Sequence, residues 1–271
     1  MDWARAKTQL IYVFIILNII LGYMLYIRDH SKYDDFDPAE ILRGHDIILD
    51  AQVPKAASFE GRKMEYKVYT EDEIKEMFFE KPKISGTNDL RTFTEGKVRV
   101  DLLQGKNIRY SNEPKPDGKL IKTLADAEAA GEKFLKEKFG EENLRLTNSD
   151  YKYDRFNLEF EQVDEKSNLI LEFAYINLVL NENGVVGMDR RTFSKVESVK
   201  TKVEMKHPKR KLLKLINMTG VAGRKVTDVQ YCYSFDPSEI PYINNPDKVL
   251  SGVAKLALRV SLDNGRVIII E

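Results

Sequence analysis

The chain has 271 residues, which is long enough for one or two domains with their own hydrophobic cores. It carries 43 Lys plus Arg and 43 Asp plus Glu, so the formal net charge is zero and the composition does not indicate a nucleic acid or another strongly anionic partner. A single cysteine, Cys232, excludes an internal disulfide, so packing alone must hold the fold together.

The first recognisable element is an apolar segment close to the N-terminus. Residues 8–27 contain no charged side chain, and a helix of this length crosses the ~30 Å hydrocarbon core of a bilayer. A cleaved signal peptide has a shorter apolar run that is followed by small residues. Here the run continues into Tyr26, Arg28 and Asp29 and offers no such site. The segment therefore predicts an uncleaved transmembrane helix over 8–27.

The charges on either side of this segment predict its orientation. Arg5 and Lys7 lie before it and are offset only by Asp2, whereas the residues after it mix both signs. The positive-inside bias then makes residues 1–7 a cytoplasmic tail and places the bulk of the chain outside the cell membrane. Residues 28–38, which include the acidic stretch SKYDDFDP, are predicted to be a juxtamembrane stalk.

One face of the predicted transmembrane helix carries a polar and a small residue. Asn18 and Gly22 are four residues apart and share this face with Ile11, Ile15 and Leu25. A glycine lets two helix backbones approach closely, and an amide in lipid gains by bonding to a neighbouring helix. The face is either a contact surface for another helix, or Asn18 bonds to its own backbone and Gly22 is incidental. The sequence leaves both open.

Local signals predict helices beyond the stalk. Asp37 followed by proline is typical of an N-cap and first turn. Residues 70–73, TEDE, match a capping box at the start of a second helix. Thr123 caps a third helix, whose apolar residues keep roughly helical spacing until Gly140 ends it.

The best internal boundary lies between the second and third of these helices. Residues 111–119, SNEPKPDGK, contain two prolines and a glycine and have no apolar side chain apart from the prolines. We therefore predict a first extracytoplasmic lobe over 39–117 and a second lobe over 118–271.

Three predicted hairpins share one plan. Residues 91–100, 177–188 and 259–270 each read as an apolar-alternating strand, an acidic or amide residue with glycine, and a valine-rich strand. The last two follow predicted helices at 125–139 and 209–218, which indicates an internal repeat unless such hairpins recur by chance. The predicted fold class is α+β, with antiparallel sheets and helices packed on one face.

The sequence contains no catalytic signature. It has no nucleophile elbow, phosphate-binding loop or dinucleotide fingerprint, and His30, His45 and His207 are far apart without metal-ligand spacing. Cys232 is expected to be a small buried residue of a strand, and His30 and His207 to be exposed loop residues. We predict no enzyme activity, cofactor or metal site. Carboxylates that only folding brings together, as in an anchored wall hydrolase, remain an alternative.

Clustered charges are expected to be solvated. The acidic pairs Asp34-Asp35 and Glu141-Glu142 read as ordinary surface charge. The basic run over 206–214, KHPKRKLLK, is expected to be a solvated linker and first helical turn, although cations there oppose the helix dipole. Its alternative is contact with anionic lipid head groups or wall polymers.

The opening MDWARAKTQLIYVFIILNIILGYMLY resembles the N-terminus of the YycI family, membrane-anchored regulators of Gram-positive bacteria that accompany the YycG (WalK) sensor histidine kinase. The resemblance also covers the single anchor, the total length and the α+β exterior with repeat-like halves. It implies a non-enzymatic two-component regulator that joins the related YycH and the kinase through transmembrane helices and tunes cell-wall metabolism genes. By position in the anchor, Trp3, Arg5, Asn18 and Gly22 are the candidates for the contact region.

A second interpretation places the activity in the exterior, as a binding, chaperone or inhibitor module. The sequence does not determine which of the two holds, whether the kinase is restrained or activated, or whether the exterior binds a small ligand.

Overall fold

The structure is a computed structural model that describes residues 3–30, 36–115, 120–140, 142–239 and 245–271, without the side chains of residues 3–6, 27–30, 239 and 247. Its helices are α1 (Trp3–His30), α2 (Pro38–Arg43), α3 (Glu71–Phe78), α4 (Leu124–Phe139) and α5 (Pro208–Leu212), with 3-10 turns η1 (Leu213–Asn217), η2 (Pro237–Glu239) and η3 (Pro246–Lys248). Its strands are β1 (Ile48–Leu49), β2 (Ala57–Tyr66), β3 (Lys83–Gly86), β4 (Leu90–Glu95), β5 (Val98–Leu103), β6 (Asn107–Ser111), β7 (Leu144–Lys152), β8 (Arg155–Val163), β9 (Ile170–Asn181), β10 (Gly184–Arg191), β11 (Phe193–Met205), β12 (Lys225–Ser234), β13 (Ser251–Val253), β14 (Lys255–Leu262) and β15 (Val267–Ile270).

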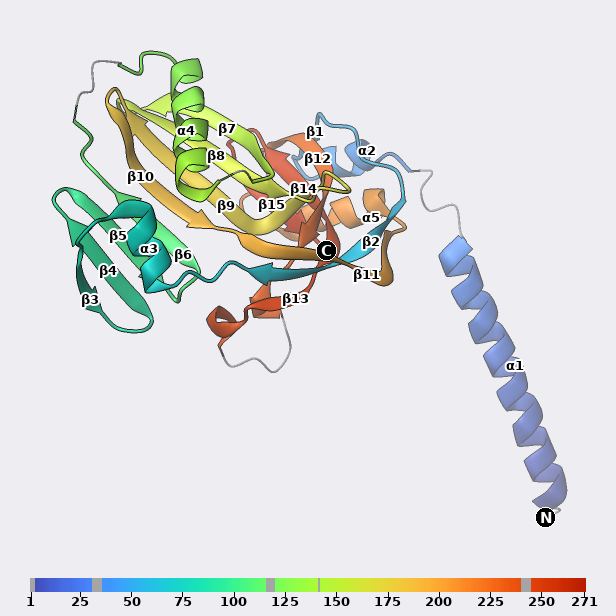
Figure 1. The fold of residues 1–271 in the computed structure, drawn as a ribbon. Coiled ribbons are helices and arrows are strands. Elements are labelled where there is room, and N and C mark those ends of the chain that lie inside the picture. Colours follow the sequence, from blue (N-terminus) through green and yellow to red (C-terminus); the bar gives the residue numbers. More distant parts are fainter. Residues whose placement is uncertain (1–2, 31–35, 116–119, 141, 240–244) are drawn as a thin grey trace.

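One large sheet organises the part of the chain beyond α1, and β9 joins its two parts (Figure 1). The larger part contains β3 to β10, because β10 pairs with both β9 and β6. The smaller part contains β12, β14 and β15, with β1 alongside β12. The link between the parts is short: Ile170 and Leu171 at the start of β9 pair in parallel with Cys232 and Tyr233 of β12. Side-chain contacts must therefore help to hold the two parts together.

Helices α3 and α4 cover the larger part of the sheet. The predicted capping box forms at α3, where Thr70 and Glu73 exchange hydrogen bonds. Thr123, the predicted cap of α4, forms a second capping box with Asp126. Their apolar faces pack on buried residues of the strands, including Leu158, and form one core with them.

Helix α4 lies very close to the sheet at Gly131. A Cβ atom on this residue would be 2.7 Å from Leu158 Cδ1 and 3.2 Å from Leu178 Cδ1, so only glycine fits without displacement. The close approach of α4 to β8 and β9 thus depends on the absence of a side chain at one helical position.

Helices α2 and α5 cover the smaller part of the sheet. Asp37 accepts a hydrogen bond from the Ala39 N–H and caps α2, as the sequence predicted. Leu42 of α2, Leu212 of α5 and Leu215 of η1 are fully buried in a second core with β12, β14 and β15. The chain is therefore part of the folded body from Pro38 onward, two residues after Phe36, the first described residue beyond α1.

A separate three-stranded sheet crosses between these two parts. It has the order β11-β2-β13, and Ser198 of β11 lies directly opposite Arg62 of β2. Its aromatic residues Tyr66 and Phe193 stack with ring centroids 4.6 Å apart and pack in a third core with Tyr233 of β12. This sheet therefore contacts the large sheet at the junction of its two parts.

The predicted fold class is confirmed: the chain is α+β, with a long apolar N-terminal helix followed by a sheet-rich body. All three predicted hairpins form, as β4-β5, β9-β10 and β14-β15. Gly96, Gly184 and Gly265 in their turns have φ values of 60°, 134° and 81°, which favour glycine.

The segment over 209–218 differs from the single predicted helix. An α-helix covers only Pro208–Leu212 and then tightens into the 3-10 turn η1. His207 at its N-cap provides no capping hydrogen bond, and the cations Lys209 and Arg210 lie in the first turn, where they oppose the helix dipole. The two helices of the predicted repeat therefore differ in length: α4 has 16 residues and α5 has five.

The predicted boundaries fall as follows. Helix α1 extends to His30 and α2 begins at Pro38, so both ends of the predicted stalk are helical, while residues 31–35 lie outside the described residues. The boundary between lobes 39–117 and 118–271 falls at residues 116–119, also outside them. Strands β6 and β10 from the two sides of this boundary pair directly.

We predict that Gly131→Val destabilises the body by about 1–3 kcal/mol, because the new side chain must displace Leu158 from a packed core. Thermal or urea unfolding of the full chain in detergent measures the change. Ala129→Val on the exposed side of α4 is the matched control and should cost less than about 1 kcal/mol. Equal losses in both variants would show that helix propensity, and not close packing, sets the effect.

Candidate functional site

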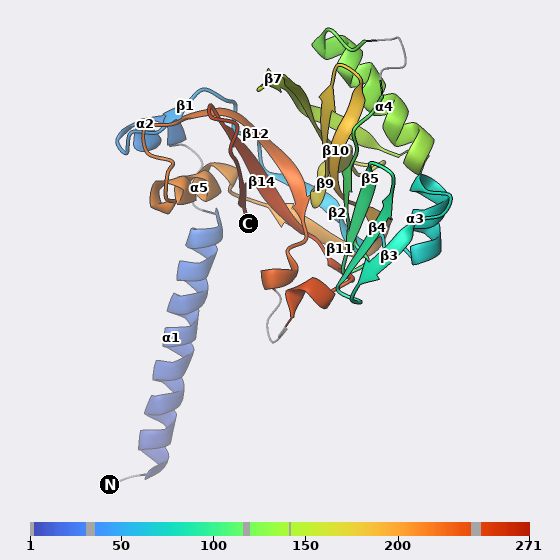
Figure 2. The ribbon, with the colours of Figure 1, turned by 90° about the vertical axis from the view of Figure 1, so that its left-hand side faces the viewer.

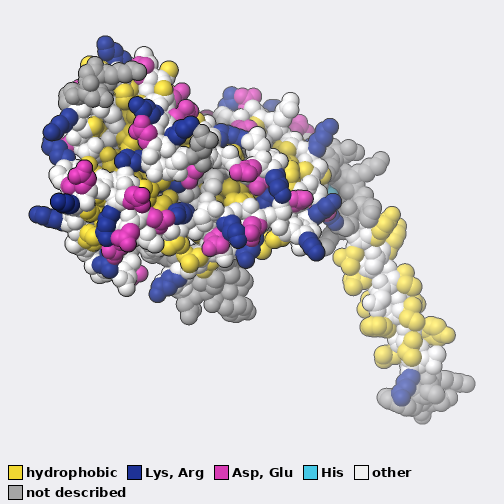
Figure 3. Space-filling view, viewed as in Figure 1, with side chains coloured by type: hydrophobic (Ala, Val, Ile, Leu, Met, Phe, Trp, Pro, Cys, Tyr) yellow, Lys and Arg dark blue, Asp and Glu magenta, His cyan; other side chains and the backbone are white. Residues whose placement is uncertain are grey.

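Helix α1 is apolar and exposed on all sides. The span Lys7–Tyr26 has a mean hydropathy of 2.0, none of it is buried against the body, and it is long enough to cross a membrane. In Figure 3, hydrophobic side chains follow most of the described part of the helix that faces the viewer. Its length and composition suit a single-pass membrane anchor or a signal sequence.

The predicted contact face of α1 is open along its length. Ile11, Ile15 and Leu25 are 57%, 48% and 49% exposed, and a Cβ atom on Gly22 would meet no atom within 4 Å. Asn18 Nδ2 donates to the Phe14 carbonyl at 2.8 Å, which is the self-bonded alternative. An amide has two N–H donors and an acceptor oxygen, so this bond uses only one of them. The five predicted residues thus share one face, while any partner for it remains a prediction.

Trp3 and Arg5 lie in the first turns of α1. Their side chains are outside the described residues, so the predicted role of these two residues in helix contacts also remains a prediction.

A polar groove of about 1100 Å³ lies in the body. Its walls come from the helices α3 and α4, the strands β2, β7, β8, β10 and β11, and the turn between β8 and β9. Six cationic and six anionic residues line it, so the groove does not select an anion or a cation by net charge. Two of its cations, Arg62 and Arg190, are nearly inaccessible to solvent.

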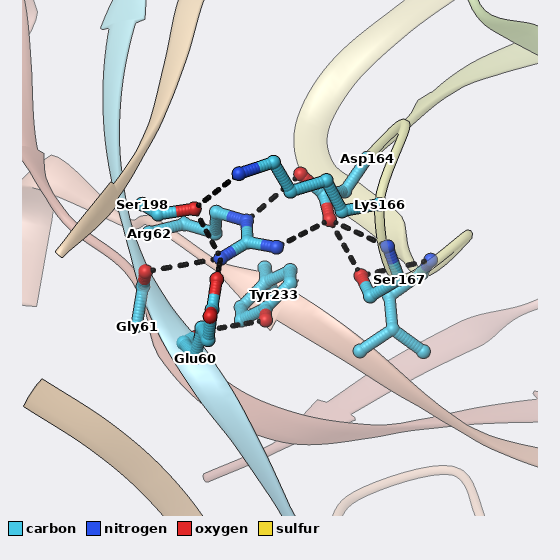
Figure 4. A network of polar contacts seen from close by, with 9 residues as sticks. Glu60, Gly61, Arg62, Asp164, Lys166, Ser167, Ser198 and Tyr233 are labelled. Atoms are coloured by element: carbon cyan, nitrogen blue, oxygen red, sulfur yellow. Dashed lines mark hydrogen bonds and ion pairs between the residues drawn. The ribbon is translucent and has the colours of Figure 1, made fainter. Parts of the chain in front are cut away.

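Arg62 is the centre of one polar network (Figure 4). Its Nε and Nη2 donate to the two carboxylate oxygens of Asp164 at 2.9 and 3.0 Å. Its Nη1 donates to Ser198 and to the Glu60 carboxylate, at 3.1 and 3.2 Å. The Tyr233 hydroxyl donates to the Glu60 carbonyl at 2.6 Å. The network thus ties the three-stranded sheet to the large sheet.

Asp164 is ionised in this network. Burial disfavours its charged form, but hydrogen bonds from Arg62 and from the Ser167 hydroxyl and N–H outweigh burial and keep its pKa below the ordinary value. The carboxylate therefore pairs with Arg62 and also holds the turn between β8 and β9.

Arg190 of β10 is the centre of a second network. Its Nη1 and Nη2 form a bidentate pair with the Glu142 carboxylate at 2.8 and 2.7 Å, and its Nε donates to the Tyr69 hydroxyl at 2.9 Å. The guanidinium also lies 3.8 Å from the centroid of the Phe139 ring. Glu142 is exposed, as expected of a surface charge, but the sequence did not predict that folding pairs it with a buried arginine. Residue 141 and the pair Asp34-Asp35 lie outside the described residues.

Arg259 of β14 is the centre of a third network. It donates to Glu172 of β9 and to Glu161 of β8, both at 2.6 Å. Burial raises the pKa of Glu161 to about 7 and raises that of Glu172, although Arg259 acts in the opposite direction. Glu161 Oε2 is buried and has no hydrogen-bond partner among the described residues. This network links the smaller part of the sheet to the larger part.

Cys232 is buried next to the third network, as the sequence predicted. Its thiol donates to the Ala257 carbonyl at 3.7 Å. Burial and the neighbouring Glu172 raise the pKa of the thiol, which opposes the reactive thiolate form. His45 is exposed, whereas His207 is partly buried at the N-cap of α5 and not the exposed loop residue expected.

Sequence reasoning missed the three buried arginines. Arg62 and Arg190 lie in strands whose alternation places them inward, but the same pattern also fits an arginine at a solvated edge. Arg259 alternates with the apolar core residues Leu258 and Val260, so the pattern of β14 places it on the opposite face of that strand. The partner carboxylates are 102 residues away for Arg62, 48 for Arg190, and 98 and 87 for Arg259. No local spacing carries such information.

This arrangement is similar to that of solved bacterial proteins. YycH from Bacillus subtilis matches with a TM-score of 0.55 at 11% sequence identity, covering 80% of this chain and 52% of that protein. The fold is YycH-like. The chain therefore spans about half the length of the YycH structure that it matches, and at this level of identity the likeness concerns the fold alone.

Two further solved structures match less well. The C-terminal domain of YpeB from Bacillus megaterium has a TM-score of 0.42 at 14% identity, covering 76% of this chain and 99% of that one. An uncharacterized protein from Eubacterium rectale has a TM-score of 0.47 at 9% identity, covering 83% and 86%. No protein-family model matches the chain, and no curated protein matches it in sequence.

We predict that Arg62→Met destabilises the body by about 3–5 kcal/mol, because it leaves the Asp164 carboxylate buried without its cation. Unfolding of the full chain in detergent measures the loss. The double variant Arg62→Met with Asp164→Leu should regain much of it. Lys75→Met removes an exposed pair with Asp72 and is the control, with a change within about 0.5 kcal/mol. A loss at Arg62 no larger than at Lys75 would contradict the role of the network.

We also predict that the stability of the body falls as the pH rises through about 7, in part because of Glu161. The folded state raises the pKa of Glu161 from the ordinary value of 4.5 to about 7, so the folded protein keeps a proton that the unfolded chain loses. The resulting stabilisation is complete below pH 4.5 and is lost as the pH rises through the folded pKa. The effect is on the order of 1–3 kcal/mol.

Unfolding of Glu161→Gln and wild type between pH 4 and 8 tests this, because the variant should lose this part of the pH dependence. Glu132→Gln on the exposed surface of α4 is the matched control and should follow wild type. A Glu161→Gln curve that runs parallel to wild type over the whole range would refute the assignment.

Proposed function

We propose that the protein is a YycI-like, non-enzymatic membrane regulator of a sensor histidine kinase of the YycG/WalK type, acting together with a YycH-like partner. The observation that carries the proposal is the combination of an exposed apolar helix and a YycH-like body in one chain. The resemblance of the N-terminal sequence to the YycI family supports the same assignment, as does the proposed orientation with the N-terminus in the cytoplasm.

The proposed mechanism depends on helix packing in the membrane. A regulator shifts the kinase between two signalling states only if it contacts those states unequally. The open face with Asn18 and Gly22 offers close backbone approach and remaining amide hydrogen-bonding groups. A few interhelical contacts of about 0.6–2 kcal/mol each add up to the 1–3 kcal/mol that changes an equilibrium about 5- to 150-fold.

The body supports a binding role rather than a catalytic one. Arg62 and Arg190 hold Asp164 and Glu142 in ion pairs, so these groove carboxylates serve as structural anions. The Cys232 thiol is buried with a raised pKa. We propose that the exterior docks onto the YycH-like partner and positions α1 next to the kinase helices. The alternative, in which the exterior alone acts as a binding or inhibitor module, makes a different prediction for the anchor.

Replacing residues 8–27 by polyleucine should abolish regulation, because it keeps the anchor and removes the contact face. Kinase autophosphorylation in vesicles that contain the kinase, the YycH-like partner and this protein measures the effect. The expected change is about 5- to 150-fold in kinase output. Unchanged output after the swap would sink the helix mechanism and favour the exterior module.

Point variants sharpen the same test. The double variant Asn18→Leu with Gly22→Leu alters the proposed face and should reduce regulation. At 100° per residue, Val13 and Ile20 lie on the opposite side of α1, so the control variant Val13→Leu with Ile20→Leu should leave regulation unchanged. Equal effects of the two pairs would show that the helix acts without a specific face.

A further inference from the structure

Strand β11 is an edge of the three-stranded sheet. Among the described residues its one partner strand is β2, which lies beside it in both views (Figures 1 and 2). At the edge of a sheet, every second residue points its backbone N–H and C=O away from the partner strand, and these groups can pair with another chain. Because β11 has 13 residues, it presents a long edge of this kind.

The hydrogen bonds of β2 show which of its residues face β11. The Arg62 carbonyl accepts from the N–H of Ala254, directly after β13, and the Tyr66 N–H donates to the carbonyl of Leu250, directly before β13, both at 2.8 Å. The backbone groups of these even-numbered residues of β2 therefore point towards β13. The odd-numbered residues between them point towards β11, because backbone direction alternates along a strand.

The same alternation identifies the outward residues of β11. Lys63 of β2 lies opposite Glu197 of β11, so these two residues exchange the backbone hydrogen bonds of the pair. The residues on either side of Glu197, Val196 and Ser198, then point their backbone N–H and C=O groups away from β2. No other described strand pairs with them.

The outward edge is closed on both sides of Val196 and Ser198. On one side, the Gln162 side chain of β8 takes the place of a strand: its Oε1 accepts from the Phe193 N–H at 2.8 Å and its Nε2 donates to the Phe193 carbonyl at 3.0 Å. On the other side, a register shift after Val199 interrupts the regular edge. Such devices protect edges from unwanted pairing, so the short stretch left between them is distinctive.

This open stretch belongs to the polar groove. Val196 and Ser198 line the groove, and Lys166 of the β8–β9 turn donates to the Ser198 hydroxyl at 3.1 Å (Figure 4). The groove volume of about 1100 Å³ exceeds the roughly 300–1,000 Å³ of typical small-molecule pockets. It therefore suits a segment of a polymer better than a small ligand.

The charges of the groove indicate which polymer. As many cationic as anionic side chains line it, so it has no excess of positive charge that would attract a polyanion. A polypeptide backbone is neutral, and in extended form it offers the alternating N–H and C=O groups that an open strand edge pairs with. The apolar side chains of Met77, Leu146 and Phe160 in the lining can contact side chains of such a segment.

We propose that the groove binds an extended polypeptide segment, which adds to β11 as a further strand through the backbone groups of Val196 and Ser198. Backbone hydrogen bonds supply affinity in this mode, and the side chains that point into the groove supply specificity. The proposal depends neither on regulation of a kinase nor on α1 spanning a membrane.

Residue-resolved hydrogen exchange of the full chain in nanodiscs tests whether the edge is open. Relative to the unfolded chain, the amides of Val196 and Ser198 should exchange at least about tenfold faster than those of Lys195 and Glu197, which are bonded to β2. Equal protection of all four amides would show a closed edge and overturn the proposal.

Peptide probes test whether a strand adds there. Random linear heptapeptides displayed on phage are selected on the full chain in nanodiscs, with empty nanodiscs used to remove non-specific binders, and the enriched peptides are synthesised. At saturation they should slow exchange at Val196 and Ser198 by about tenfold or more and leave Lys195 and Glu197 unchanged. A selection that enriches no peptide, or peptides that bind without this alternating protection, would contradict strand addition.

Methylated peptides separate backbone pairing from side-chain contact. Two series carry N-methyl groups on every second backbone nitrogen, at odd or at even positions. An added strand turns only one set of N–H groups towards β11, so one series should lose about 5- to 150-fold in affinity while the other binds like the parent. Equal losses in both series would refute the pairing. This arm uses the wild-type protein and is independent of any folding defect of a variant.

A matched pair of variants places the contact on the protein. Ser198→Pro removes an outward N–H without removing a bond to β2, and should weaken peptide binding about 5- to 150-fold. Ser198→Ala loses the same hydroxyl but keeps the N–H, and should bind like wild type. Thermal unfolding checks that both variants fold. Equal binding by folded Ser198→Pro and Ser198→Ala would overturn the assignment of the edge.

Other occupants give different results. Protection of Val196 and Ser198 that grows with protein concentration in the absence of peptide would assign the edge to a second copy of the chain. Protection by soluble peptidoglycan strands, together with none by any selected peptide, would assign the groove to a wall polymer. Either result overturns the proposal.

Discussion

Buried ion pairs between distant segments are the constraint on which the arrangement of the body depends. Arg62 joins the three-stranded sheet to the β8–β9 turn, and Arg190 joins β10 to Glu142 after α4. Arg259 joins the smaller part of the large sheet to the larger part. A buried guanidinium without its carboxylate is strongly unfavourable. Each pair therefore penalises any arrangement in which its two segments separate.

The backbone alone would hold these parts weakly. Only two residue pairs connect β9 with β12, yet this short parallel contact joins the two parts of the large sheet. Glu172 is the next residue of β9 after this contact, and its carboxylate accepts a hydrogen bond from Arg259 of β14. The three-stranded sheet then crosses the junction and buries Tyr66 against Phe193. Ion pairs and aromatic packing thus make a body of several parts act as one unit.

A rigid body has a mechanical consequence for an anchored protein. Phe36 is the first described residue after α1, and α2 directly after it packs into the core of the smaller part of the large sheet. Because the connection to α1 is short, a change in the position of the body on the membrane surface also limits the positions that α1 can take.

The local elements could be predicted from the sequence, because the signals for each of them lie within a short stretch of the chain. Thr70 with Glu73 and Thr123 with Asp126 identify helix starts, because a capping box is complete within four residues. Gly96, Gly184 and Gly265 identify hairpin turns, because their positive φ values favour glycine. The uncharged run over 8–27 identifies the apolar helix by its length alone.

By itself, the sequence determined the apolar helix, the α+β class, the three hairpins and the burial of Cys232. Only the tertiary structure decided that Glu142, Asp164 and Glu161 are partners of buried arginines, and that the basic run at 206–214 lies beside the start of the body at Phe36. The physical reason is range. Caps, turns and hydropathy act between neighbours in the chain, whereas the desolvation of a charge and its pairing depend on segments that folding alone brings together.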